Sequence, residues 1–109
     1  MLLTAVIGMA SLAWAHPRAK LEPLLGDESG HVGVYIQVFS GGCTTNESFQ
    51  VVTKVTDDVK KVYFYRVRPD YCRAFYRYGT RIFFSYDQLK IADGERFQIM
   101  NPRTTIIKH

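Results

Sequence analysis

The chain has 109 residues, of which 47% are hydrophobic and 22% are charged, and its formal net charge is +4. This length and apolar content suit a single domain with one hydrophobic core. They exclude collagen-like and intrinsically disordered classes. They also leave no room for the repeated strand–helix units of a dinucleotide-binding enzyme.

The first 15 residues form an apolar stretch without a charged side chain. It ends in Ala-Trp-Ala, and small residues at the last and third-last positions are those that signal peptidase accepts. We therefore expect residues 1–15 to be a signal peptide, cleaved between Ala15 and His16. The stretch is shorter than the roughly 20 apolar residues of a membrane span, so no span is expected. The alternative is a buried N-terminal helix.

Residues 16–30 contain two prolines and two glycines and show no hydrophobic period. Such a segment predicts an extended N-terminal arm, in which Leu24 and Leu25 touch the core. Residues 31–109 would then form the folded domain.

A two-residue hydrophobic period begins at residue 31 and continues through most of the chain. It predicts strands over 31–40, 49–55, 59–68, 81–86 and 95–100, an extended segment or strand over 72–78, and a last edge strand over 104–107. The residues of the first strand that should point inward are Val32, Val34, Ile36 and Val38. In 59–68 both faces carry apolar residues, so the pattern does not choose the inward face.

Turn residues separate these predicted strands. Thr56, Asp57 and Asp58 form a polar turn, and Pro69 should end the strand before it. The sequence from Ser85 to Gln88 has the form of a capping box and predicts one short helical turn over 86–90, ended by Asp93-Gly94. Strands at about 10-residue spacing predict an all-β fold. We expect a small antiparallel β-sandwich, immunoglobulin-like, of about seven strands.

The two cysteines, Cys43 and Cys72, lack the spacing of a metal site. In an oxidising compartment they would pair with each other, which stabilises the fold by about 3–4 kcal/mol in the chain-entropy model. The alternative is two buried free thiols in a cytosolic protein. Together with the apolar start, the cysteines predict a secreted or periplasmic protein.

Residues 66–81 hold five arginines and one aspartate, so the whole excess of positive charge lies in this stretch. Arginine binds carboxylates and phosphates through its planar fork, and both arginine and tyrosine are enriched at interface hot spots. The stretch is a solvated strand–turn–strand unit with its aromatics in the core, a protein-binding patch, or a site for an anionic polymer. Export argues against intracellular nucleic acid. The residues predicted to bind a partner are Arg66, Arg68, Tyr71, Arg73, Tyr76, Arg77 and Tyr78.

Catalytic motifs are absent: the chain has no G-x-S-x-G elbow and no H-E-x-x-H pair. The Asp57-Asp58 pair is more typical of a solvated turn than of a catalytic dyad. We therefore expect a non-enzymatic binding domain without a cofactor, whose partner and oligomeric state the sequence does not identify. One alternative is an inhibitor of a secreted hydrolase that inserts loop 40–48 or 68–80 into a cleft. Another is a structural subunit of a surface assembly.

Cleavage after Ala15 would make His16 the N-terminus. Its α-amine and imidazole can share one Cu(II) ion, and His31 would add a third nitrogen if the arm folds back. Pro17 has no N–H to lose, which removes one further amide ligand. Copper handling is therefore a further alternative function.

Overall fold

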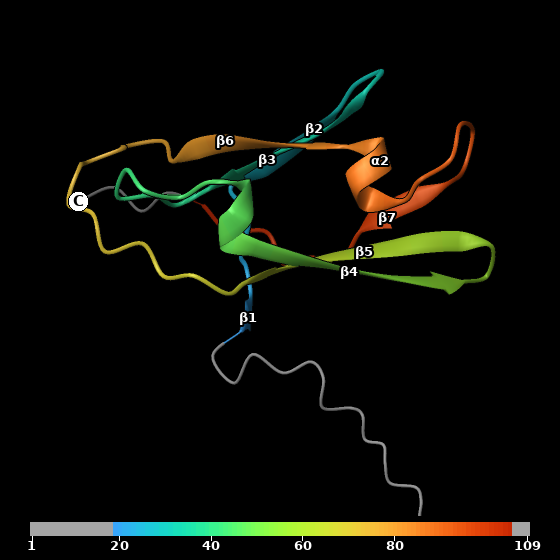
Figure 1. The fold of residues 1–109 in the computed structure, drawn as a ribbon, viewed down its shortest axis with the longest axis horizontal. Coiled ribbons are helices and arrows are strands. Elements are labelled where there is room, and N and C mark those ends of the chain that lie inside the picture. Colours follow the sequence, from blue (N-terminus) through green and yellow to red (C-terminus); the bar gives the residue numbers. More distant parts are fainter. Residues whose placement is uncertain (1–18, 106–109) are drawn as a thin grey trace, which may run out of the picture.

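The computed structural model describes residues 19–105. The predicted signal peptide, His16 and residues 106–107 of the predicted last strand lie outside the described residues. Within 19–105 the chain is mostly β, with seven strands in one four-stranded and one three-stranded sheet. Figure 1 shows the two sheets as two layers. No helix in this range is long and apolar enough to cross a membrane.

The three-stranded sheet contains β2 (Gly26–Ser29), β3 (Gly33–Val38) and β6 (Thr80–Ser85), with β3 in the centre and both pairs antiparallel. The inward face predicted for β3 is confirmed at Val34, Ile36 and Val38, which are fully buried. The expectation for Val32 is wrong: this side chain is 70% exposed, because it lies in the bend before β3.

The four-stranded sheet is built on the hairpin of β4 (Phe49–Thr56) and β5 (Val59–Arg66). The predicted turn is confirmed, and both Asp57 and Asp58 have positive φ, 55° and 63°. This is the geometry of a type I′ hairpin turn, which aspartate tolerates. On its other edge β5 pairs with β1 (Lys20–Leu21) and, in parallel, with β7 (Phe97–Ile99). The parallel pair corrects the expectation of a purely antiparallel fold.

One core joins the two layers. Val62 and Phe64 of β5 are fully buried, which settles the inward face of that strand. The ring centroid of Phe84 in β6 lies 4.9 Å from that of Phe64 and 6.3 Å from that of Phe49. The all-β prediction with two sheets is therefore confirmed by aromatic contacts that cross from one sheet to the other.

The described part of the predicted arm is built into both sheets, because β1 and β2 lie within it. Leu24 lies between these two strands and is fully buried, so its predicted contact with the core is confirmed. Its backbone N–H donates to the Pro102 carbonyl, and its carbonyl accepts from the Thr104 N–H.

The predicted capping box is confirmed at α2 (Tyr86–Leu89), where Ser85 Oγ accepts from the Gln88 N–H and Gln88 Oε1 accepts from the Ser85 N–H. The expected terminator is wrong: the helix ends at Lys90, whose φ of 59° is left-handed, before Gly94 is reached. A second short turn, η2 (Asn46–Ser48), precedes β4.

Residues 67–79 form no strand and connect β5 to β6. This connection is drawn in yellow at one end of Figure 1, and the β4–β5 turn lies at the opposite end. Of the two forms expected for 72–78, an extended segment or a strand, the strand is absent; side chains 71–78 are all exposed, so the segment buries no apolar face. The strand predicted from Thr104 is also absent at Thr104 and Thr105.

Candidate functional site

Large aromatic side chains are exposed on residues 67–79, which we call the arginine–tyrosine loop. Tyr71 is 81% exposed, Phe75 85%, Tyr76 46% and Tyr78 58%. The interpretation that places these aromatics in the core is therefore wrong. Exposed aromatic side chains grouped on one loop make it a candidate interaction site.

Asp70 fastens the start of this loop to residues 40–44, which we call the bracing loop. Its carboxylate accepts five hydrogen bonds of 2.7–3.1 Å, four of them on Oδ2. The donors are the hydroxyls of Ser40 and Thr44 and the backbone N–H groups of Gly41, Cys43 and Cys72. One side chain thus fixes the positions of two loops.

These donors also lower the pKa of the Asp70 carboxyl group. The Thr44 hydroxyl contributes most, and the N–H groups of Gly41, Cys72 and Cys43 add to it; together they outweigh the opposing effect of burial and hold the pKa of Asp70 well below its usual range. Asp70 is therefore a carboxylate at neutral pH, and its charge is used within the protein.

The predicted disulfide between Cys43 and Cys72 is confirmed, with their Cα atoms 5.7 Å apart. It makes a second link between the same two loops, and the Ala74 N–H donates to the Gly41 carbonyl at 2.8 Å as a third. A Cβ atom at Gly41 would lie 2.1 Å from the Cys72 carbonyl oxygen, so this close approach requires glycine.

Arg66 is engaged inside the protein rather than presented to a partner. Its Nε and Nη2 donate to the two carboxylate oxygens of Glu22 at 2.9 and 2.8 Å. Nη1 donates to Thr44 Oγ1, Nη2 also donates to the Phe39 carbonyl, and the guanidinium lies 4.9 Å from the ring centroid of Phe49. Because Thr44 in turn donates to Asp70, the network runs without a break from Glu22 to the arginine–tyrosine loop.

Asn101 completes this support. It is buried, its Oδ1 accepts from the Phe64 N–H at 2.9 Å, and its Nδ2 donates to the carbonyls of Glu22 and Phe64. The amide fills the edge of β5 between β1 and β7 and so positions the ion pair. No sequence signal identified Glu22 or Asn101, because both act through partners far away along the chain.

The other six predicted binding residues do lie on the arginine–tyrosine loop. Arg68 is 3.7 Å from Glu47, and both side chains are exposed. Arg77 stacks on the ring of Tyr78 at 5.6 Å. Within residues 19–105 neither Arg73 nor Arg77 has an ion-pair partner. The last arginine of the charged stretch, Arg81, lies on β6 and pairs with Glu28.

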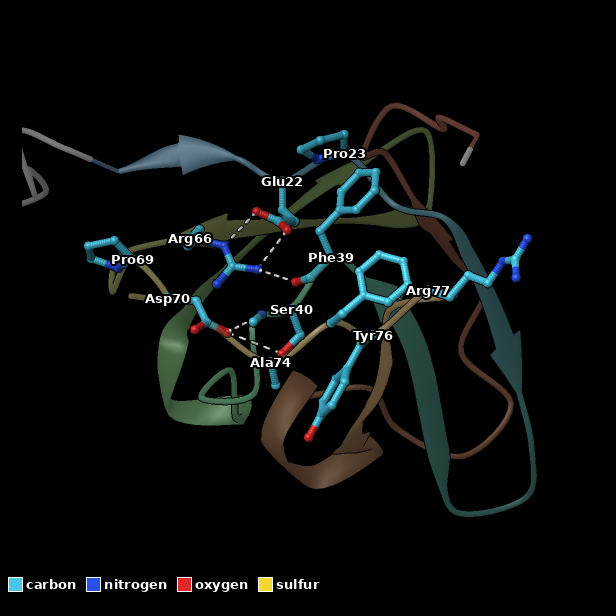
Figure 2. Close-up of a pocket in the computed structure, with 12 residues that line it drawn as sticks. Glu22, Pro23, Phe39, Ser40, Arg66, Pro69, Asp70, Ala74, Tyr76 and Arg77 are labelled. Atoms are coloured by element: carbon cyan, nitrogen blue, oxygen red, sulfur yellow. Dashed lines mark hydrogen bonds and ion pairs between the residues drawn. The ribbon is translucent and has the colours of Figure 1, made fainter. Parts of the chain in front are cut away.

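Two cavities flank the ion pair of Glu22 and Arg66. The first, which we call the Phe39 cavity, has a volume of about 560 Å³ and lies between the bracing loop and the arginine–tyrosine loop (Figure 2). The second, about 740 Å³, lies beside β1 and includes Tyr71. Phe39 and Phe75 line the first cavity and were not among the predicted site residues. Phe75 stands between the predicted arginines, so its position in the sequence could have indicated it.

The predicted metal ligands are not brought together. His31 is exposed in the bend before β3, and its predicted companion His16 lies outside the described residues. Within 19–105 the one cluster with metal-ligand geometry is Cys43, Asp70 and Cys72, whose two sulfurs are joined in the disulfide. Copper handling therefore stays a prediction.

The site is thus a cationic, aromatic loop held to a second loop by a carboxylate and a disulfide, beside two cavities. No protein-family model, curated protein or solved structure matches the chain.

Proposed function

We propose that this chain is a small, non-enzymatic binding domain that captures a protein partner through the arginine–tyrosine loop. The observation that carries the proposal is the exposure of four large aromatic side chains, from 46% to 85%, on a loop that contributes none of them to the core. Tyrosine and arginine are enriched among the few residues that dominate the binding energy of protein interfaces. The disulfide and the Asp70 bonds lower the ordering cost of binding, because the loop is held before the partner arrives.

A protein partner is favoured over an anionic polymer by the use of the arginines. Of the five in residues 66–81, Arg66, Arg68 and Arg81 have carboxylate partners within the protein. Affinity for a polyanion grows with the number of phosphates or sulfates that the protein neutralises. Two unpaired guanidiniums among four exposed aromatics suit a protein surface better.

Export is part of the proposal. The disulfide is compatible with an oxidising extracellular or periplasmic compartment, and the apolar start of the chain is typical of a signal peptide. We also propose an immunoglobulin-like sandwich as the fold type; two sheets that share one core support it, whereas the parallel β5–β7 pair departs from that pattern.

The experiment is partner capture from the extracellular fraction of producing cells, with the exported protein as bait and mass spectrometry as readout. The test variant carries Tyr76→Ala and Arg77→Ala. The matched control carries Lys54→Ala and Val55→Ala, two exposed residues near the β4–β5 turn at the other end of the molecule. We expect a protein retained by the native chain and the control to be reduced about tenfold with the test variant.

Equal retention by the native chain and the test variant would refute the loop as the binding surface. A salt series separates the polymer alternative, because capture through a polyanion weakens steeply with ionic strength.

Inhibition of a secreted hydrolase is a second candidate, favoured by one observation: the two predicted inhibitory segments, 40–48 and 68–80, are held to each other by the disulfide. A supported pair of loops can enter a cleft without rearranging. If the captured partner is a hydrolase, its turnover of a small substrate should fall in proportion to added native chain. Unchanged turnover would exclude this candidate and leave capture intact.

A further inference from the structure

We infer that the Phe39 cavity receives one apolar side chain of an acidic peptide segment, and that Arg77 at its rim binds the neighbouring carboxylate. The inference rests on the proposed function and names the chemistry of the partner: an extended segment in which a large apolar residue stands next to aspartate or glutamate.

The apolar part of the argument is the wall of the cavity. Pro23, Phe39, Ala74 and Phe75 line it, and residues Phe39 and Phe75 are 46% and 85% exposed. Water gains no hydrogen bond from these surfaces, so an apolar side chain that covers them is favoured. A volume of about 560 Å³ is within the range of sites that accept small ligands. It accommodates one aromatic side chain with part of its backbone.

The two carboxylates that line the cavity, those of Glu22 and Asp70, are engaged within the protein. Both oxygens of Glu22 accept from Arg66, and the Asp70 carboxylate accepts five hydrogen bonds (Figure 2). Both carboxylates therefore have their hydrogen-bond partners within the protein, and the charge of Glu22 is matched by that of Arg66.

Arg77 is the second arginine that lines the cavity. Arg77 lies at its rim with the guanidinium directed away from Arg66 (Figure 2), and no carboxylate within residues 19–105 pairs with it. Guanidinium and carboxylate form short, two-pronged hydrogen bonds. An acidic residue beside the apolar anchor is therefore attracted, and a basic residue in the same place is repelled by Arg77.

The test uses amide NMR spectra of the full chain and three blocked peptides: acetyl-Asp-Phe-Asp-amide, acetyl-Asp-Ala-Asp-amide and acetyl-Lys-Phe-Lys-amide. We expect the first peptide to give saturable shifts at the amides of Ser40, Gly41 and Ala74, which line the cavity. The alanine peptide lacks the apolar anchor and the lysine peptide has the wrong charge, so the affinity of each should be at least about fivefold lower.

Two variants test the apolar contact and the charge contact separately. Phe39→Ala removes part of the apolar wall and should weaken the Asp-Phe-Asp peptide about threefold without changing the Asp-Ala-Asp peptide. Arg77→Gln should abolish the preference for Asp-Phe-Asp over Lys-Phe-Lys. Arg96→Gln makes the same change of charge at an exposed residue next to β7 and should leave that preference unchanged.

Equal shifts with all three peptides, or full binding by Phe39→Ala, would overturn the inference. The inference would also be overturned if dextran sulfate shifted the amide signals of Arg73 and Arg77 in the native chain while none of the peptides shifted any signal. These outcomes are separate from those of the capture experiment. If the captured partner is lost with the Tyr76→Ala, Arg77→Ala variant but retained by Phe39→Ala, the binding role of the cavity is refuted and that of the arginine–tyrosine loop is kept.

Discussion

Two regions of this molecule are held in place by different interactions. Between the sheets, the side chains of Val34, Ile36 and Phe64 are fully buried and pack against neighbouring strands. In the arginine–tyrosine loop, side chains 71–78 are all exposed, and the loop is fixed by the Asp70 carboxylate and a disulfide. The core shows what a repeating apolar pattern can build. The loop shows how a surface can be ordered while its aromatic groups stay available.

Thr44 and Arg66 connect the two regions. Arg66 ends a core strand, forms an ion pair with Glu22 and donates to Thr44, which donates to Asp70. Each polar group in this network has a hydrogen-bond partner, so the network can lie at the edge of the core without an unsatisfied group. Loss of the core should therefore also release the loop, because Arg66 lies at the end of a core strand.

The largest expected effect on stability is that of Phe64→Ala. Phe64 is fully buried and its ring contacts Phe84 of the opposite sheet, so its removal leaves a cavity in the shared core. We expect the free energy of unfolding to fall by about 3–5 kcal/mol, measured by urea denaturation. A loss below about 1 kcal/mol would mean that the two sheets do not depend on this contact.

Replacing both cysteines, Cys43→Ser with Cys72→Ser, should remove about 3–4 kcal/mol by releasing the unfolded chain from its cross-link. The cross-link spans 29 residues and joins the bracing loop to the arginine–tyrosine loop. In hydrogen exchange we expect the Ala74 amide, which donates to Gly41 across the two loops, to lose protection before the amides of β3. Simultaneous loss in both would show that the loop and the core unfold as one unit.

The sequence predicts the first region well and the second poorly, for a physical reason. Alternation places Val34, Ile36 and Val38 correctly, because side chains two residues apart on a strand lie on the same face. It fails at Val32, which has the right period but lies before the strand begins. The segment 72–78 was predicted as extended or as a strand, yet no apolar side of it is covered.

The site depends on contacts that no local pattern encodes. Four of the hydrogen bonds of Asp70 reach residues 26–30 positions away. Arg66 was predicted to face a partner because it stands among other arginines, whereas Glu22, 44 positions away, holds it inside. The disulfide could be predicted, since two cysteines allow one pairing. Charge and aromatic content located the loop, but not which arginines remain available.

A smaller effect is expected for Asp70→Asn, which removes the charge and one of the two accepting oxygens while keeping the size of the side chain. We expect a loss of about 1–3 kcal/mol at neutral pH, because several N–H and O–H groups of the bracing loop lose a charged acceptor. Far-UV circular dichroism should be unchanged, and the amides of Gly41 and Cys43 should exchange faster. Unchanged exchange there would mean that the disulfide alone fixes the loops.

The same variant predicts a dependence on pH. The pKa of Asp70 is lowered in the folded protein, so its contribution to stability is present above the unfolded value of about 3.9 and is lost as pH falls from there toward the folded pKa. The difference in unfolding free energy between the native chain and Asp70→Asn should therefore stay constant from about pH 7 to about pH 5 and shrink below about pH 4. A difference that grows with acid would contradict this assignment.

The smallest effect on stability should come from Phe75→Ala, and this variant separates the two regions most clearly. Phe75 is 85% exposed and contributes nothing to the core, so the free energy of unfolding should change by less than about 0.5 kcal/mol. The same side chain lines the Phe39 cavity, so capture of the partner should fall markedly. In Phe64→Ala the order is reversed: stability falls, and the fraction that remains folded should still bind, because the loop keeps its own links. If Phe75→Ala instead lowered stability as Phe64→Ala does, the loop would be an extension of the core, and the exposure of its aromatics would have to be explained by packing rather than by recognition.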